Sequence, residues 1–307
     1  MSMVTNSALM IPARQGGYAV GAFNTSNLEI TQAIFEAAAE ERSPIIIATS
    51  QSAIKYAGYA NIVSMVRNLA DETGVSASLH LDHGTDMKVI EACVEHGWTS
   101  VMIDGSHHPL EENIAVTKQV VEMARPAGVS VEAELGRLMG VEDEIVVSEG
   151  EAVYTDPDEA ERFVDETGCD ALAIAIGTSH GAYKFKGEAR LAIERLKAIS
   201  ERVSIPLVLH GASAVPQDVL ELARRYGADL PGARGVPAES ISEAVTHGIA
   251  KINIDTDLRL AFTARVREFL AESPDVFDPR KILAAARSGM KDVVRGKMQL
   301  FGSAGRL

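Results

Sequence analysis

Three histidines, His83, His180 and His210, each stand at or shortly after the end of a short apolar run that has the composition of a buried β-strand. Imidazole is a favoured zinc ligand, and a catalytic zinc typically has three protein ligands with one position left open. A single histidine of this kind is more often hydrogen-bonded in a core or loop. Three at equivalent positions favour a metal site, because a barrel brings its strand ends together.

Four acidic residues, Asp82, Asp104, Glu132 and Glu134, end the same or neighbouring apolar runs. They could be charges that merely cap loops. Burying several acids near one another is costly unless a cation compensates their charge. A metal at the histidines would supply that cation, so the acids support the metal-site hypothesis.

The apolar runs that end at His210 and Ile254 are followed by residues suited to phosphate. Gly211-Ala212-Ser213 offers small side chains, backbone N–H groups and a hydroxyl, and the segment 253–256 adds further polar groups. A Gly-x-Ser turn alone is a weak signal. Its position is more informative, because the loops after strands seven and eight form the usual phosphate site of a (β/α)₈ barrel, where helix N-termini favour anions.

The other histidines are expected to have lesser roles. His80 is expected to point into the barrel interior and support the site. The remaining four are expected to lie in helices or loops and face solvent: His96, His107, His108 and His247.

The elements that would position these residues alternate between short apolar runs and longer amphipathic stretches. Strands separated by helices indicate a parallel sheet covered by helices, and eight such units predict a closed (β/α)₈ TIM barrel; an open doubly wound sheet is the alternative. The expected strands are Tyr18–Phe23, Pro44–Thr49, Ser76–Asp82, Ser100–Asp104, Ser130–Glu134, Ala171–Ile176, Pro206–His210 and Ala250–Ile254. The expected helices are Leu28–Glu41, Ile62–Glu72, Asp86–His96, Leu110–Ala127, Asp158–Thr167 and Arg190–Glu201.

The chain shows no interdomain linker, so residues 1–307 are expected to form a single catalytic barrel domain. Two long connections, Arg137–Thr155 and Tyr226–Ser240, have the length of functional lids or covers. A helix over Pro279–Leu300 predicts a C-terminal helical extension to the barrel.

The composition narrows the possible partners and the compartment. A net charge of −14 argues against non-specific binding to nucleic acid or to an anionic membrane, although a local basic pocket can still accept an anionic substrate. Cys93 and Cys169 form no CxxC pair and are expected to be buried free thiols, as in a reducing compartment. No secretory signal and no apolar run of the roughly 20 residues needed to span a membrane is visible. We therefore expect a cytoplasmic protein.

The motifs taken together resemble the class II, metal-dependent fructose-bisphosphate aldolases, most of all the shorter bacterial branch. Each motif could arise by chance, but their order and spacing over nearly the whole chain are specific. The matching segments are Gly21-Ala22-Phe23-Asn24, His80-Leu81-Asp82-His83-Gly84, Val101-Met102-Ile103-Asp104, Glu132-Ala133-Glu134-Leu135-Gly136, Ser179-His180-Gly181-Ala182-Tyr183-Lys184, Leu209-His210-Gly211-Ala212-Ser213, residues 253–257 and Asp278-Pro279-Arg280.

The resemblance implies a role for each chemical group. His83, His180 and His210 would bind a catalytic Zn²⁺, and Asp104 and Glu134 would hold a second, non-catalytic divalent metal. His-rich sites also bind cobalt or iron, so the residues alone do not select zinc.

Two further carboxylates would move protons. Asp82 resembles the acid/base that acts on the C4 hydroxyl. Glu142, in the acidic loop after the fifth strand, resembles the group that moves the C–H proton of the triose. The reaction implied is the reversible cleavage of fructose 1,6-bisphosphate into dihydroxyacetone phosphate and glyceraldehyde 3-phosphate, as in glycolysis and gluconeogenesis.

The resemblance also implies the substrate contacts. Asn24 and Ser50 match polar positions on the substrate side, and Asp278 would accept a hydrogen bond from a substrate hydroxyl. Arg259 and Arg280 would bind the C6 phosphate, with Arg280 reaching in from a neighbouring subunit of a homodimer or homotetramer. The C1 phosphate and a nearby monovalent cation (Na⁺ or K⁺) would contact Gly181, Lys184, Gly211, Ser213, Asn253, Asp255 and Thr256.

Three alternatives remain at this point. Tagatose-type relatives tend to carry a small residue at position 255 and a lysine at 259, so Asp255 and Arg259 favour the fructose epimer, unless the two form only a surface ion pair. A Schiff-base aldolase would need a lysine inside the barrel. Lys251 is the only lysine in the expected strands, and it is expected to be structural and away from the site. A non-catalytic sugar-phosphate-binding barrel would lack Asp82 and Glu142, and both are present.

Overall fold

The computed structural model describes residues 3–142, 145–147, 153–180, 191–214, 216–230 and 235–307; side chains are described for these ranges except 139–142, 145–147 and 180. Eight parallel strands close into a barrel, in the order β1-β11-β10-β8-β5-β4-β3-β2. The (β/α)₈ prediction is confirmed, and the open sheet is excluded. The strands are β1 (Val20–Asn24), β2 (Ile45–Ser50), β3 (Ala77–Gly84), β4 (Ser100–Ile103), β5 (Ser130–Leu135), β8 (Ala171–Ile174), β10 (Leu207–Leu209) and β11 (Ile249–Ile254).

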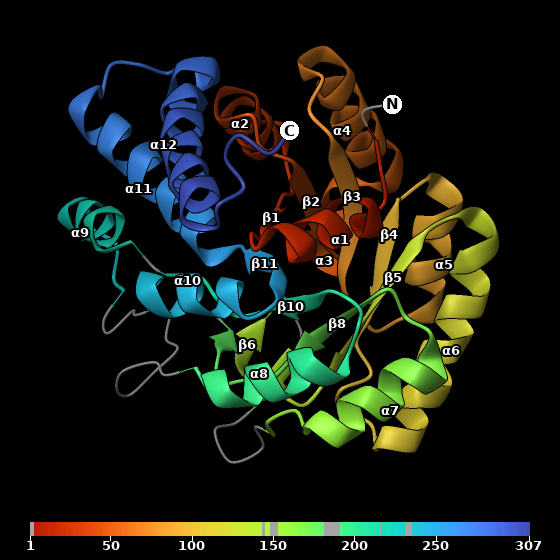
Figure 1. The fold of residues 1–307 in the computed structure, drawn as a ribbon. Coiled ribbons are helices and arrows are strands. Elements are labelled where there is room, and N and C mark those ends of the chain that lie inside the picture. Colours follow the sequence, from red (N-terminus) through yellow and green to blue (C-terminus); the bar gives the residue numbers. More distant parts are fainter. Residues whose placement is uncertain (1–2, 143–144, 148–152, 181–190, 215, 231–234) are drawn as a thin grey trace.

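Helices surround this barrel, as Figure 1 shows. Because both faces of each strand are covered, strands such as β2 and β4 are mainly apolar. The predicted helix at Leu28–Glu41 is observed with the same bounds, and most of the others begin or end within three residues of the prediction. The helices between strands are α2 (Leu28–Glu41), α3 (Gln51–Ala57), α4 (Tyr59–Thr73), α5 (Met87–His96), α6 (Leu110–Ala124) with the 3₁₀ turn Arg125–Ala127, α7 (Pro157–Thr167), α8 (Ile193–Arg202), α9 (Gln217–Arg225) and α10 (Ala238–Thr246).

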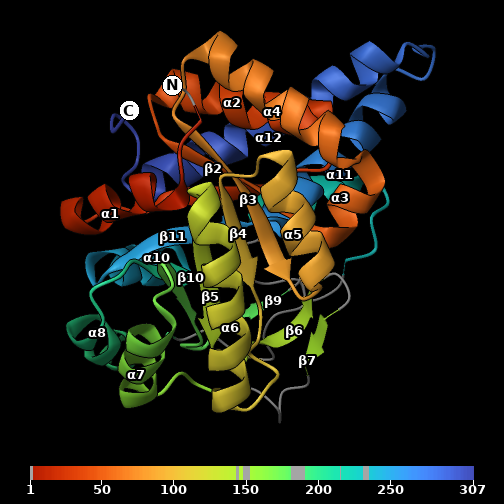
Figure 2. The ribbon, with the colours of Figure 1, turned by 90° about the vertical axis from the view of Figure 1, so that its right-hand side faces the viewer.

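The two ends of the barrel are closed differently. An N-terminal helix, α1 (Asn6–Gly16), packs its Leu9, Met10 and Ala13 against the residues that fill the barrel interior. Figure 2 shows α1 at one end of the barrel and a small sheet at the other. This sheet consists of β6 (Met139–Glu142), β7 (Ile145–Val147) and β9 (Ser179–His180), so part of the long connection expected at Arg137–Thr155 forms a β-hairpin.

Two long helices form the predicted C-terminal extension. After α11 (Thr256–Glu272), α12 (Pro279–Leu300) returns along α2, with the predicted bounds. The ion pairs Lys291–Glu40 (2.8 Å) and Arg295–Glu41 (2.8 Å) join α12 to α2. The chain end therefore belongs to the helical layer of the barrel. No helix within the described ranges is long and apolar enough to cross a membrane.

Candidate active site

His83 and His210 meet at the centre of the barrel's C-terminal end. His83 Nε2 lies 2.8 Å from His210 Nδ1, and both side chains are buried. His83 has φ +49°, and the β3–β4 register shifts between Leu81 and Gly84. An irregularity of this kind turns a side chain away from its regular direction, and strained backbone of this kind tends to cluster at functional sites. Here it places the His83 ring against His210.

Each of these two rings is held from behind by a carboxylate. His83 Nδ1 lies 3.1 Å from Asp104 Oδ2, and His210 Nε2 lies 2.8 Å from Glu132 Oε1. Carboxylates in these positions can accept the N–H of those nitrogens, which favours the tautomers that present the facing nitrogens to a metal. This carboxylate–histidine arrangement is typical of histidines that bind metals.

Burial favours the neutral form of the His210 ring, while neighbouring groups keep the acids ionised. Burial, together with the neighbouring His83, lowers the pKa of His210. Burial alone would raise the pKa of Asp104, but hydrogen bonds from His83 and Ser106 outweigh it and hold that pKa well below its usual range. For Glu132, burial is likewise outweighed by the charge of Lys251 and by contacts with His80 and His210, so its pKa is also low. Unprotonated imidazole nitrogens among carboxylates suit a divalent cation.

Two sets of ligand atoms in the described side chains are close enough to hold a metal. Asp82, His83 and His210 form one, and His83, Asp104 and Glu134 form the other, with all ligand atoms of a set within 4.8 Å of one another. His83 belongs to both sets, so its ring lies between two groups of potential metal ligands. His180 is in β9, beside Gly140 of β6, and Glu142 ends β6; the side chains of both lie outside the described part.

Asp82 of β3 is buried and lies between two asparagine side chains, which come from the mutually adjacent strands β1 and β11. Asn24 Nδ2 donates to one carboxylate oxygen at 2.9 Å, and Asn253 Nδ2 donates to the other at 2.7 Å. Asn24 and Asn253 were expected to contact substrate, and their amide N–H groups hold Asp82. Among the described residues their buried Oδ1 atoms have no hydrogen-bond partner, which leaves an acceptor on each for a substrate hydroxyl.

A cleft of about 220 Å³ is lined in part by Asn24, whose amide donates a hydrogen bond to Asp82, and by several more of the expected substrate contacts. Asn24, Ser50, Asp255 and Arg259 line it. Arg259 is bound to Asp255 at 2.8 Å, and its side chain is 63% exposed. The surface ion pair considered as the alternative is therefore present, but it lies in the wall of the cleft.

The expected phosphate turn is tightly packed. Gly211 has φ +61°, and a Cβ there would lie 2.7 Å from the backbone oxygen of Ser179, so only glycine fits. Ser213 is buried beside it, and Asn253 and Thr256 follow at the end of β11 and the start of α11. The turn thus joins β9, β10 and β11. Gly181 and Lys184 lie outside the described residues.

Asp278 and Arg280 are not part of the described wall of this cleft. They stand at the start of α12, paired with each other at 2.8 Å, and the Arg280 side chain is 89% exposed. Neither residue is among the described residues that line the cleft. The structure of one chain thus does not bring them to Asp82.

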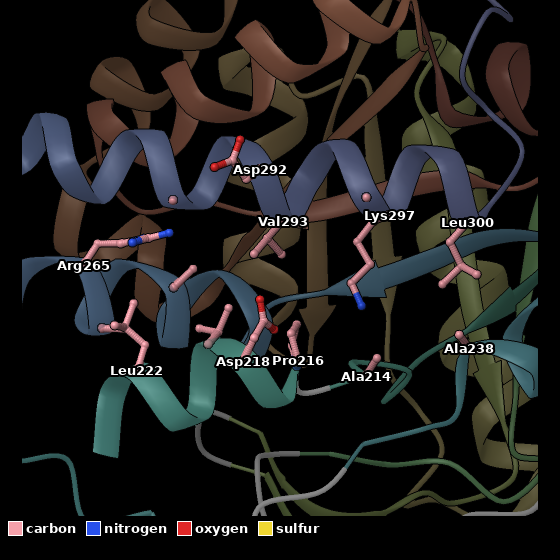
Figure 3. Close-up of a pocket in the computed structure, with 15 residues that line it drawn as sticks. Ala214, Pro216, Asp218, Leu222, Ala238, Arg265, Asp292, Val293, Lys297 and Leu300 are labelled. Atoms are coloured by element: carbon pink, nitrogen blue, oxygen red, sulfur yellow. The ribbon is translucent and has the colours of Figure 1, made fainter. Parts of the chain in front are cut away.

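A larger cavity, of about 420 Å³, lies outside the barrel between α9, α11 and α12 (Figure 3). Lys297 points into it from α12, and its Nζ lies 2.6 Å from buried Asp257. Asp257 also accepts the backbone N–H of Ala214 at 3.1 Å. This ion pair braces the residue that follows Ser213, so α12 supports the expected phosphate turn from behind.

Lys251 was expected to lie away from the site, but its side chain contacts a residue that holds one of the site histidines. Its Nζ lies 2.8 Å and 2.9 Å from the two oxygens of Glu132, which in turn contacts His210. The sequence alone indicated such a contact, because the charge of a lysine inside an apolar strand has to be paired with an acidic group. The supporting role of His80 agrees with its position: it is fully buried, with Nδ1 2.9 Å from Ser100 Oγ.

The comparisons with known proteins agree with this geometry. The family model described as "Fructose-bisphosphate aldolase class-II" matches residues 4–306. The chain belongs to the class II fructose-bisphosphate aldolase family. It is therefore an aldolase, a lyase of the metal-dependent class.

Individual relatives match over the same length. The chain is 53% identical over 304 residues to the fructose-bisphosphate aldolase of Thermus caldophilus, covering 99% of both chains. It is 51% identical over 306 residues to that of Helicobacter pylori, covering 99% of this chain and 100% of the relative. Among solved structures, the YdjI aldolase from Escherichia coli K12 matches with a TM-score of 0.82, at 33% identity over 99% of both chains.

Proposed function

We propose that this aldolase reversibly cleaves fructose 1,6-bisphosphate into dihydroxyacetone phosphate and glyceraldehyde 3-phosphate, with a catalytic Zn²⁺ held by His83, His180 and His210. The observation that carries the proposal is the pair of facing nitrogens of His83 and His210, each ring backed by a carboxylate, with Asp82 alongside. When bound, the metal supplies Lewis-acid stabilisation of the negative charge that develops on the three-carbon fragment.

Asp82 is the proposed acid/base for the C4 hydroxyl. The amides of Asn24 and Asn253 hold its carboxylate and favour the ionised form that can take a proton. In cleavage Asp82 takes the hydroxyl proton as the C3–C4 bond breaks, and in synthesis it returns the proton to the aldehyde oxygen. Glu142 then protonates the carbon of the three-carbon fragment. Asp104 and Glu134 are the proposed holders of a second divalent ion.

The two phosphates occupy opposite sides of Asp82 in this proposal. The C1 phosphate binds at the turn formed by Gly211, Ser213, Asn253, Asp255 and Thr256, completed by Gly181 and Lys184 and by a monovalent cation. The tight packing of that turn and the bracing by Asp257 support this assignment.

The C6 phosphate binds at the wall of the cleft in this proposal. Arg259 binds it from the same chain, and Ser50 lies across the cleft. Arg280 does not line its own chain's cleft, and we propose that it reaches the site of a neighbouring subunit, with Asp278 beside it. This requires a homodimer or homotetramer. We also propose a cytoplasmic location, supported by the two buried free cysteines, Cys93 and Cys169.

Discrimination between the C4 epimers tests the substrate assignment. Arg259 can hold a phosphate through a planar, two-pronged guanidinium, which lysine cannot copy. A fixed phosphate fixes which face of C4 presents its hydroxyl to Asp82. We therefore expect a higher kcat/KM for fructose than for tagatose 1,6-bisphosphate, and a smaller ratio in Arg259→Lys.

The matched control is Arg267→Lys on the exposed face of the same helix, which should leave the ratio unchanged. Equal kcat/KM values for the two epimers in the native protein would refute the preference. An unchanged ratio in Arg259→Lys would remove Arg259 from its cause.

A further inference from the structure

Lys251 is a fully buried lysine in the middle of β11, the strand that also carries Asn253. Its backbone is paired with Val20 of β1 and Val208 of β10, so it lies well inside the closed barrel. An ammonium group in such a place is costly unless it is paired and hydrogen-bonded. Its side chain is inaccessible, so it cannot itself contact a substrate.

The partner of Lys251 is Glu132 of β5, which is equally buried. Lys251 Nζ contacts both carboxylate oxygens, at 2.8 Å and 2.9 Å. The oxygen at 2.9 Å, Oε1, also accepts the N–H of His210 Nε2 at 2.8 Å. One carboxylate oxygen is therefore shared between the lysine and the histidine.

This sharing links Lys251 to the proposed metal ligands in a continuous chain. It runs from Lys251 Nζ through Glu132 Oε1 to His210 Nε2, and across the ring to His210 Nδ1, which faces His83. Each link in the chain is buried, and the two contacts of Glu132 Oε1, at 2.9 Å and 2.8 Å, have the lengths of hydrogen bonds to a charged group. A displacement of the Glu132 carboxylate would therefore rotate the His210 ring.

Other neighbours of Glu132 do not replace the lysine. His80 Nε2 lies 3.6 Å from Glu132 Oε2, longer than a hydrogen bond. With Lys251 removed, the carboxylate would keep only its bond to His210, and nothing else among its described contacts would fix its rotation.

We infer that Lys251 is a positioning residue, which locks the Glu132 carboxylate in the orientation that aims His210 Nδ1 at the metal and so tightens metal binding. The inference rests on the proposed metal site at His83 and His210. It assigns to Lys251 no contact with substrate and no covalent step. Partners that orient a metal-bound histidine typically contribute about 10- to 100-fold to metal affinity.

The test compares Lys251→Met with Lys251→Met/Glu132→Gln in the full-length protein. The zinc dissociation constant is measured by competition with a chelator, and the thermal midpoint of the metal-free protein is measured in parallel. Lys251→Met should weaken zinc binding by about 10- to 100-fold. It should leave KM for the bisphosphate nearly unchanged at saturating zinc. The double variant removes both charges, so it should regain much of the thermal midpoint but none of the zinc affinity.

Lys297→Met is the matched control. It breaks a second buried lysine–carboxylate pair, with Asp257, that has no described contact with a histidine. It should lower the thermal midpoint comparably but leave zinc affinity unchanged. A Lys251→Arg variant that folds should retain most of the zinc affinity, because it keeps a charged donor.

Three results would overturn the inference. Native zinc affinity in Lys251→Met would reduce the lysine to a structural role. Recovery of zinc affinity in the double variant would make its role charge neutralisation alone. An equal loss of affinity in Lys297→Met would show that the effect comes from general destabilisation. Failure of the native protein itself to bind zinc would refute the metal site, and the native measurement separates that case from the others.

Discussion

Replacing Asp82 by alanine separates proton transfer from metal binding. Asp82 neighbours His83 in the chain, and its carboxylate lies within 4.8 Å of the ligand atoms of His83 and His210. It could therefore be either the acid/base or a metal ligand. Its hydrogen bonds decide our expectation, because both oxygens already accept an amide N–H from Asn24 or Asn253.

The expected magnitude follows from this geometry. Loss of a positioned general acid/base typically costs about 10²- to 10⁴-fold in rate. At about 1.4 kcal/mol per factor of ten, this is roughly 3–5 kcal/mol of transition-state stabilisation. Metal affinity should change little, because His83 and His210 keep their supporting carboxylates, Asp104 and Glu132.

The assay is kcat for cleavage of fructose 1,6-bisphosphate, together with zinc content by atomic spectroscopy. Asp86→Ala is the control: Asp86 is exposed and caps α5 through its bond to the Lys88 N–H, so its loss should cost about 1 kcal/mol of stability. That variant should keep native kcat. If Asp82→Ala loses its zinc together with its activity, Asp82 is a ligand or a support of the ligands, and the acid/base assignment fails.

Two further predictions concern stability and phosphate binding. Burial, with the charge of Lys251, lowers the pKa of His80 to about 3 from 6.5. Protonation of the unfolded chain should therefore remove about 1.4 kcal/mol of stability per pH unit as pH falls from 6.5 toward 3, or about 2 kcal/mol at pH 5. Urea unfolding of the metal-free protein at pH 7 and pH 5 should show a smaller loss in His80→Gln, and an identical loss would contradict this. Lys297→Met leaves Asp257 buried without its cation and should cost about 3–5 kcal/mol of stability. It should also raise KM for the bisphosphate more than it lowers kcat, because Ala214 loses its brace; an unchanged KM would remove this ion pair from phosphate binding.

Local patterns in the sequence were sufficient for most of the barrel. The runs around Ile45 and Leu172 are apolar throughout because both faces of these strands are covered, and α2 follows a clear helical periodicity. The helix α1 was missed. It contains Pro12, which cannot donate an N–H within a helix, and it is stabilised by the barrel interior that Leu9 and Met10 cover. Packing of a helix against residues far away in the chain cannot be predicted from the local sequence pattern.

The same distinction holds for the site. The strand-end positions of His83 and His210 could be read from the sequence, because any (β/α)₈ barrel gathers its strand ends. Which side chain touches which depends on the tilt and stagger of the closed barrel. The amide bonds of Asn24 and Asn253 to Asp82 join residues 58 and 171 positions apart.

The Lys251–Glu132 pair shows the same limit, since its members are 119 positions apart. A lysine in an apolar strand indicates that an acidic residue pairs with it in the core, but the sequence does not identify that residue. Only the closed barrel brings the β5 and β11 side chains together.

The most direct test of the account is a zinc titration of the metal-free protein during cleavage of fructose 1,6-bisphosphate. We expect no measurable cleavage without metal, and activity that rises over the first equivalent of Zn²⁺ per chain. In His83→Ala and His210→Ala the first equivalent should restore nothing. Full activity in the rigorously metal-free protein, or substrate trapped on a lysine by borohydride, would contradict the account.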